Sequence, residues 1–221
     1  MRTRTRIALA VVVCLAVLLA LGPSAARAGS SRGKVLIVNT NAGTVTVIDA
    51  AKKVVLGNPP VGNHPSKLAT DSQGRLAYVI NPGSDDLSVI NLQTFAVLNV
   101  PLDFEPSDLT ITPNGTTVVI LHADPDVASG GNAFKGDYTI YDAKKGSIVR
   151  TNRLNELGSA THDPCGIKSD SSGDAVWITD CATNKAALVD LRKAREDDSG
   201  DEMRAVLDTQ TNPSFIEITS R

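Results

Sequence analysis

Aromatic side chains are scarce in this sequence: Phe, Tyr and Trp make up 4% of its 221 residues, and Trp occurs once. So few rings provide no stacking platform for sugars or nucleic-acid bases. The chain also lacks a Ser-His-Asp order, a phosphate-binding loop and a dinucleotide fingerprint, and no segment keeps a helical hydrophobic period. These absences remove the usual signatures of nucleic-acid readers and of several enzyme classes, and the remaining patterns are those of β structure.

Only one long apolar run is present, from Ile7 to Leu21. Three arginines precede it, and the small-x-small triplet Ala26-Arg27-Ala28 follows. This order predicts a secretory signal peptide, residues 1–28, cut before Gly29. The run is short for a membrane span and no second one follows, so we expect no stable membrane insertion after cleavage. An uncleaved anchor is the alternative. The mature chain, 29–221, is expected in the periplasm or outside the cell.

The net charge of the chain is slightly negative, so it gives no general electrostatic attraction for polyanions. The formal net charge is −2, and removal of 1–28 takes away four arginines, which leaves −6. A mildly acidic exported protein is not expected to bind nucleic acid or anionic lipid.

Cysteine is also rare, with three in the chain, and Cys14 lies in the apolar run. The remaining two, Cys165 and Cys181, form an even pair in an exported chain, which favours a disulfide. They flank a predicted hairpin centred near Gly173, where they face each other across an antiparallel pair at a separation that a disulfide tolerates. We therefore predict a Cys165–Cys181 bond.

The most informative feature is an internal repeat of four units. Each unit has a Val/Ile-rich strand ending in a polar residue, a loop, and a second strand ending in Asp or Asn. The strand pairs are 35–39 with 45–49, 77–81 with 87–91, 118–122 with 138–142, and 176–180 with 187–190. A Pro-led segment precedes the last three pairs at Pro65, Pro106 and Pro164 and recurs at Pro213, and a further apolar run follows each pair.

Four short strands in about 40 residues are typical of a propeller blade, whereas a generic β-sandwich would not repeat its turns so regularly. We predict an all-β chain: a β-propeller of four four-stranded blades. The first unit lacks a Pro-led strand and the chain supplies a spare one at its end, so we expect the C-terminal strand to complete the N-terminal blade and close the ring. The predicted blades are 213–218 with 33–58, 64–102, 105–155 and 163–209.

The run Tyr78-Val79-Ile80-Asn81, with its turn at Gly74 and the following Leu87-Ser-Val-Ile-Asn91, resembles the repeat of the YVTN family of β-propellers. Members of that family include lactonase-like enzymes, partners of cofactor enzymes and surface proteins. They are typically larger, which leaves three arrangements here: a small closed ring, two chains sharing a larger ring, or an open arc. The complementary ends favour the small ring, and both a monomer and a homodimer stay open.

Two sets of repeated positions are expected to open on one polar face of such a ring. The first precedes the blade-leading prolines and the second ends the second strands. The members are His64, Glu105, Asp163 and Asn212, and Asn39, Asn81, His122 and Asp180. His122, His162, Asp163 and Asp180 come from neighbouring units and are the candidate ligands of a divalent metal. The alternative is that they are turn-forming residues bonded to local amides.

An insertion in the third unit, 123–136, is the second candidate site. It carries Asp124, Asp126 and Asn132 beside glycines, without the spacing of an EF-hand. A solvated loop is the alternative, although loops on rigid scaffolds often determine ligand specificity.

Other recurring residues are interpreted as structural. Asp49, Asn91, Asp142 and Asp190 occupy one repeated position, where side-chain capping of the next turn explains all four. Tyr78 and Trp177 occupy equivalent second-strand positions and are predicted to lie in the core between blades.

The expected function is a non-catalytic, exported scaffold that binds a protein or small ligand through its loop-bearing face. No cofactor is predicted. The alternatives are a lactonase-like hydrolase, in which the four metal candidates activate water, and a periplasmic partner of a redox-cofactor enzyme.

Overall fold

The computed structural model describes residues 33–122, 138–152, 154, 163–196, 203–211, 213 and 216–219. The predicted signal peptide, the insertion residues Asp124, Asp126 and Asn132, and also His162 and Asn212 lie outside these residues. Within them, no helix has the length and apolarity needed to cross a membrane.

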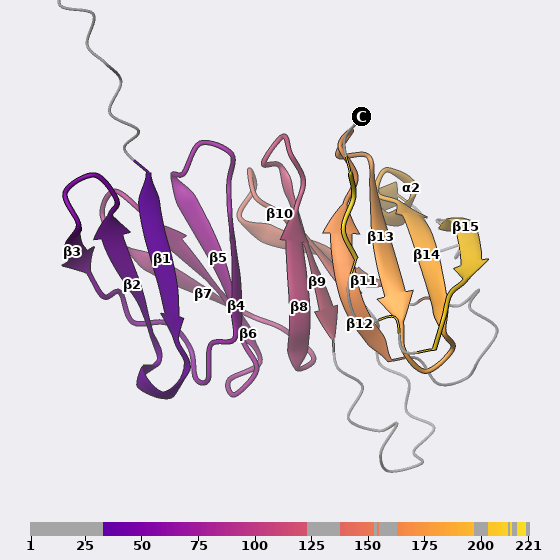
Figure 1. Ribbon diagram of the computed structural model, residues 1–221, viewed down its shortest axis with the longest axis horizontal. Helices are drawn as coiled ribbons and strands as arrows, with labels where there is room; N and C mark the ends of the chain where they lie inside the picture. Colours follow the sequence, from indigo (N-terminus) through magenta and orange to yellow (C-terminus); the bar gives the residue numbers. More distant parts are fainter. Residues whose placement is uncertain are drawn as a thin grey trace, which may run out of the picture. The chain divides into compact units, whose positions relative to one another are not determined.

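Four antiparallel sheets account for nearly all of the described structure, and we number them blades 1 to 4 in chain order (Figure 1). Blade 1 has three strands: β1 (Lys34–Asn39), β2 (Thr44–Asp49) and β3 (Val54–Gly57). Blade 2 has β4 (Lys67–Thr70), β5 (Leu76–Asn81), β6 (Asp86–Asn91) and β7 (Val97–Pro101). Blade 3 has β8 (Pro106–Ile111), β9 (Thr117–His122), β10 (Tyr138–Asp142) and β11 (Ser147–Asn152). Blade 4 has β12 (Pro164–Ser169), β13 (Ala175–Asp180), β14 (Lys185–Asp190) and β15 (Met203–Asp208). The only helical turns described are η1 (Thr40–Ala42) and α2 (Lys193–Glu196).

Each four-stranded sheet is a meander, because its strands are paired in chain order. The hairpins between first and second strands turn at Gly74, Gly115 and Gly173, whose φ angles of 61°, 67° and 75° favour glycine. The predicted capping at the repeated Asp/Asn position is confirmed. Asp142 Oδ1, for example, accepts hydrogen bonds from the amides of Lys144 and Lys145 at 2.9 and 3.0 Å. The recurring turns thus fix the register of the repeat.

The hydrophobic core lies between successive sheets rather than inside any one of them. One cluster joins blades 1 and 2 around Val45, Val47 and Val79, and a second joins blades 2 and 3 around Tyr78 and Ile120. A third joins blades 3 and 4, and includes Leu121, Ile140, Ile178 and Val189. Sheets stacked face to face in this way are the blades of a β-propeller, so the predicted fold class is correct.

Closure of the ring by the C-terminal strand is not seen among the described residues. Blade 1 has three strands, and the described residues of 213–219 form no strand with β1. They lie instead against blade 4, where Glu217 forms an ion pair with Lys168 of β12 at 3.3 Å. The placement of 213–218 in the first sheet of the same chain therefore stays a prediction. The repeat specifies the kind of strand and not which copy of a second strand it pairs with.

Candidate functional site

The polar residues that end the second strands are used inside the blades. Asn39 donates to Thr46 Oγ1 at 2.8 Å, and Asn81 donates to Ser88 Oγ at 2.8 Å. In blade 3, His122 Nε2 bonds Thr139 Oγ1 at 2.7 Å. The three hydroxyls occupy equivalent positions on the third strands of their blades. Each forms one further hydrogen bond, to Asn58, Asn99 and Thr151 respectively. This three-residue relay ties the strands together, so Asn39, Asn81 and His122 have a structural role that competes with ligand binding.

His122 is almost fully buried, with 1% of its surface exposed. Its Nδ1 lies 3.2 Å from the Phe104 carbonyl oxygen, which can only accept, so Nδ1 carries the proton and Nε2 accepts from Thr139. The Phe104 ring meets the imidazole edge to face, with 5.5 Å between ring centroids. Burial lowers the pKa of His122 from 6.5 to about 4, because it penalises the charged form. The imidazole is neutral at pH 7 and both nitrogens are occupied.

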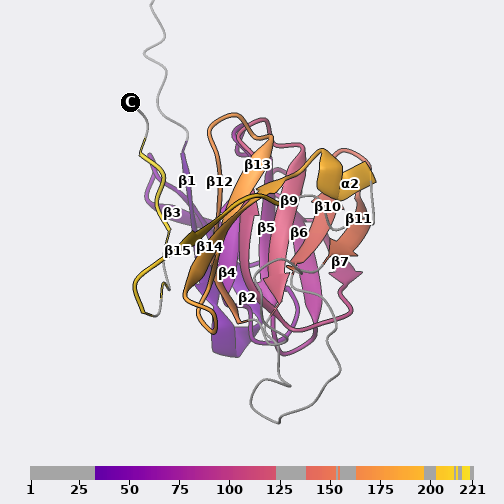
Figure 2. The same cartoon turned by 90° about the vertical axis from the view of Figure 1, so that its right-hand side faces the viewer.

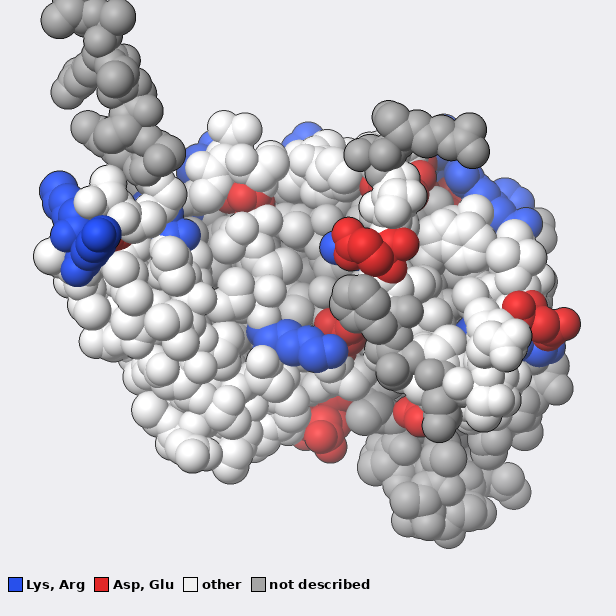
Figure 3. Space-filling view, in the orientation of Figure 1, with Lys and Arg blue, Asp and Glu red and all other residues white. Residues whose placement is uncertain are grey.

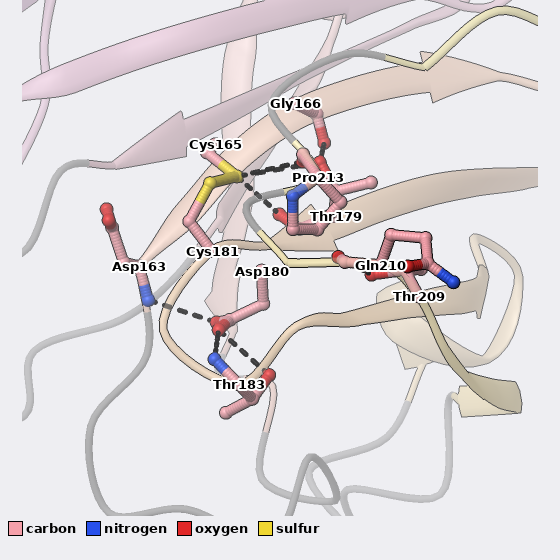
Figure 4. The surroundings of a disulfide bond; sticks show 10 residues. All are labelled: Asp163, Cys165, Gly166, Thr179, Asp180, Cys181, Thr183, Thr209, Gln210 and Pro213. Atoms are coloured by element: carbon pink, nitrogen blue, oxygen red, sulfur yellow. Dashed lines mark hydrogen bonds between the residues drawn. A yellow bond between two sulfur atoms is a disulfide. The ribbon is translucent and has the colours of Figure 1, made fainter.

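Blade 4 varies the relay, because Ala187 replaces the hydroxyl. Asp180 is fully buried at the equivalent strand end, and its Oδ2 accepts from the amide of Asp163 at 3.0 Å. Its Oδ1 accepts from the amide and the hydroxyl of Thr183 at 2.8 and 2.9 Å. The structure thus brings Asp163 and Asp180 together as a loop anchor (Figure 4).

The four candidate metal ligands are not assembled in the part of the chain that the structure describes. No group of three His, Cys, Asp or Glu side chains suited to a metal occurs among the described residues, and His162 lies outside them. Of the remaining rim candidates, His64 and Glu105 are exposed side chains ahead of their prolines. The metal site therefore stays a prediction without structural support.

The predicted disulfide is confirmed, with Cys165 and Cys181 bonded and their Cα atoms 6.0 Å apart. Cys165 is the extra residue of a β-bulge, because Pro164 pairs with Asp180 and Gly166 pairs with Thr179. Its sulfur lies 3.2 Å from the carbonyl oxygen of Pro213, and Figure 4 shows Pro213 beside Thr179. The bond thus fastens the start of blade 4 at the place where the C-terminal segment passes.

A groove of about 660 Å³ runs along the first strands of blades 2 to 4, and we call it the inner groove. Its lining includes Leu68, Leu109, Ile167 and Ile216 as apolar contacts. Lys67 pairs with Asp108 at 3.1 Å, and Lys168, which also lines the groove, pairs with Glu217. Figure 3 shows this side of the molecule, with wide uncharged areas and a few neighbouring basic and acidic side chains.

Sequence reasoning missed the inner groove, although the signal was present. The first strand of a propeller blade lines the channel, and alternate residues of a strand face the same side. Lys67 and Asp108 lie two residues after their leading prolines, and Lys168 lies four residues after its own, so all three face the same side. The described residues before the prolines, which were the predicted candidates, lie on the exposed rim instead.

The two lysines give the groove its chemical character. Their side chains are 49% and 44% exposed, and exposed ion pairs of this kind contribute only about 0–1 kcal/mol. An anionic ligand would compete with Asp108 and Glu217 for these lysines, while its apolar part contacts Leu68, Ile167 or Ile216. The groove thus combines apolar contacts with two lysines that are partly exposed to solvent.

Comparison with solved structures supports the fold alone. Dihydro-heme d1 dehydrogenase NirN, solved in complex with DHE, is 13% identical with a TM-score of 0.64 over 82% of this chain and 36% of that chain. The β-propeller domain of Myceliophteria thermophila Cps50 (Swd1) is 14% identical, with a TM-score of 0.61 over 83% and 57%. A functionally unknown protein from Desulfotomaculum acetoxidans DSM 771 is 12% identical, with a TM-score of 0.50 over 85% and 69%.

The chain is thus a β-propeller protein, and it spans about a third of the NirN chain and just over half of the Swd1 chain. No protein-family model and no curated protein matches the sequence. Membership of the YVTN family accordingly remains a resemblance.

Proposed function

We propose that this protein is an exported, non-catalytic binding scaffold that holds a small anionic and largely apolar ligand in the inner groove. The observation that carries the proposal is the placement of Lys67 and Lys168 along one apolar-lined groove of about 660 Å³. The confirmed disulfide is compatible with export. NirN is named as a dihydro-heme d1 dehydrogenase and gives a precedent for this fold in a protein that acts on a large cofactor.

Fluorescence titration with protoporphyrin IX, a flat apolar molecule with two carboxylates, tests the proposal. We expect saturable binding that weakens by about tenfold in the double variant Lys67→Met/Lys168→Met, which corresponds to about 1.4 kcal/mol. The control variant Lys144→Met/Lys145→Met removes the same charge from an exposed turn and should bind as the parent does. Equal affinity for both variants, or no saturable binding, would reject the inner groove as an anion site.

The lactonase-like alternative has less support from this geometry. To bind a metal, His122 would have to leave the Phe104 carbonyl or the Thr139 hydroxyl and expose a group that is now 1% accessible. The redox-partner alternative stays a prediction.

A further inference from the structure

Among the described residues, blade 1 has no counterpart of the strand that the other blades place innermost. β1 is the equivalent of β5, β9 and β13, each of which pairs on one side with a Pro-led first strand. Among the described residues, β1 pairs with β2 alone. Blade 1 therefore presents an unpaired strand edge, which in a stable protein is normally covered.

In the described structure, no blade covers the face of blade 1 that points away from blade 2. Comparison with the equivalent residues of blade 2 indicates that this face is suited to pack against another blade. Val35 and Ile37 of β1 are 46% and 45% exposed, whereas the equivalent Ala77 and Val79 of β5 are fully buried against blade 1. Ile48 is likewise the equivalent of Ile90, which is fully buried in the same cluster. These three apolar side chains therefore occupy positions that are buried between blades elsewhere in the repeat, but no blade precedes blade 1 in the described structure to cover them.

Blade 4 presents the complementary face, which is turned toward the viewer in Figure 2. Trp177 of β13 is the equivalent of Tyr78, which meets Tyr141 of the next blade edge to face with 6.2 Å between ring centroids. Leu188 is the equivalent of Val89 and packs on no further blade in the described structure. Trp177 was predicted to lie between blades, as Tyr78 does, yet it is only half-buried.

The described residues of the C-terminal segment, 213 and 216–219, already occupy the place of a next first strand. Lys67 of β4 pairs with Asp108 at the same strand position on β8, and Lys168 of β12 pairs with Glu217, again at the same position counted from the leading proline. In Figure 1 the segment runs alongside β12. It is thus aligned beside blade 4 at the position of a fifth first strand, and no second strand pairs with it among the described residues.

We propose that a second copy of this chain supplies that strand and completes the ring. The C-terminal segment of one copy pairs with β1 of the other, and the blade 4 face with Trp177 and Leu188 packs on the partner's Val35, Ile37 and Ile48. The register follows from the pairs Thr70–Ala77 and Ser169–Val176, which place Ile218 opposite Val35. Two copies related by a two-fold axis form this contact twice, so the β1 edge of each copy is paired.

A second copy fits better than closure within one chain because this chain matches only part of a solved propeller. A ring of four sheets must rotate by a quarter turn at each step. The chain instead covers 57% of the Swd1 propeller domain, and a ring that four blades fill only in part leaves room for further blades. Four more blades from a second copy continue the three interfaces that already exist within the chain.

Light scattering of the purified mature chain tests the assembly. We expect twice the chain mass, and we expect Ile37→Asp and Leu188→Asp, on the two opposite faces, each to give folded monomers by circular dichroism. Leu98→Asp is the matched control, because Leu98 is 55% exposed on β7 outside both faces, and it should stay dimeric. A monomeric parent, or dimeric Ile37→Asp and Leu188→Asp variants, would overturn the proposal.

A cysteine pair then distinguishes the two ways of closing the ring. In the double variant Val35→Cys/Ile218→Cys, opposed positions lie within disulfide reach only if the segment pairs with β1. We expect a band of two linked chains on a non-reducing gel. A bond formed within a single chain would show closure by the protein's own segment, and either that result or the absence of any bond would contradict the proposal.

Discussion

At the scale of single residues, the relay explains why polar side chains recur at the strand ends. Asn, Asn and His all reach a hydroxyl on the next strand, so the chemical type varies while the hydrogen bond is kept. Among them only His122 has an ordinary pKa near physiological pH, at 6.5, and burial lowers the pKa of this imidazole to about 4 in the folded protein. The residue therefore makes stability dependent on pH.

The sign of this dependence follows from the lowered pKa. The unfolded chain binds the proton below pH 6.5, whereas folded His122 binds it only near pH 4, so stability is complete above 6.5 and decreases between 6.5 and 4. Urea unfolding at pH 7 and pH 4.5 should differ by about 2–3 kcal/mol. His122→Asn, which copies Asn81, should remove most of that difference, and the exposed His64→Asn should retain it. An unchanged difference in His122→Asn would contradict the assignment.

Two buried tyrosines provide a second test at this scale. Among the described residues, the Tyr78 hydroxyl has no hydrogen-bond partner, and burial raises the pKa of Tyr78 to about 12. Tyr138 Oη instead accepts from Asn152 at 3.2 Å. We expect Tyr78→Phe to leave the free energy of unfolding unchanged or raise it by about 1 kcal/mol, and Tyr138→Phe to lower it by about 1 kcal/mol. Equal losses in urea denaturation would show that the Tyr78 hydroxyl is paired.

At the scale of elements, the sequence predicted strands and turns well because both depend on local chemistry. The capping Asp and Asn residues, the positive-φ glycines and the paired cysteines lie within a few residues of what they organise. The partner of the C-terminal segment is not a local property. Its Pro-led pattern identifies a first strand, but any equivalent of β1 satisfies that pattern.

The disulfide is the element-scale feature with the clearest energetic effect. It joins residues 16 apart, and closing a loop of this size stabilises a protein by about 3 kcal/mol in the chain-entropy model. We expect Cys165→Ala/Cys181→Ala to lower the free energy of unfolding by about 2–3 kcal/mol. Reducing the parent protein should give the same loss in thermal denaturation, and reductant should not affect the variant. Parent and variant melting alike without reductant would show that the bond adds no stability.

At the scale of the whole molecule, the repeat predicted the number of blades. Closure of the ring depends on contacts between faces, such as Tyr78 against Tyr141, which the strand pattern does not record. The inner groove was missed for a related reason, since it exists only where first strands from three blades lie together.

Assembly from two copies has a thermodynamic consequence at this scale. Because unfolding would then separate two chains, the melting temperature should increase with protein concentration. Trp177, the only tryptophan, lies in the proposed contact, so its emission should shift to longer wavelength on dilution. Ile37→Asp should show neither effect, while Leu98→Asp should show both. A concentration-independent melting temperature in the parent would contradict the two-copy ring.

The three-residue relay has a consequence for how this protein can change. In blades 1 to 3 it ties the strands together at the end from which the β9–β10 connection leaves, and blade 3 keeps its relay although that connection is the long one. The hydrogen bonds that hold these strand ends together are thus kept whatever the length of the connection. Connections of another length or sequence can therefore be introduced at these strand ends, in evolution or by protein engineering, to alter recognition while the sheets stay the same.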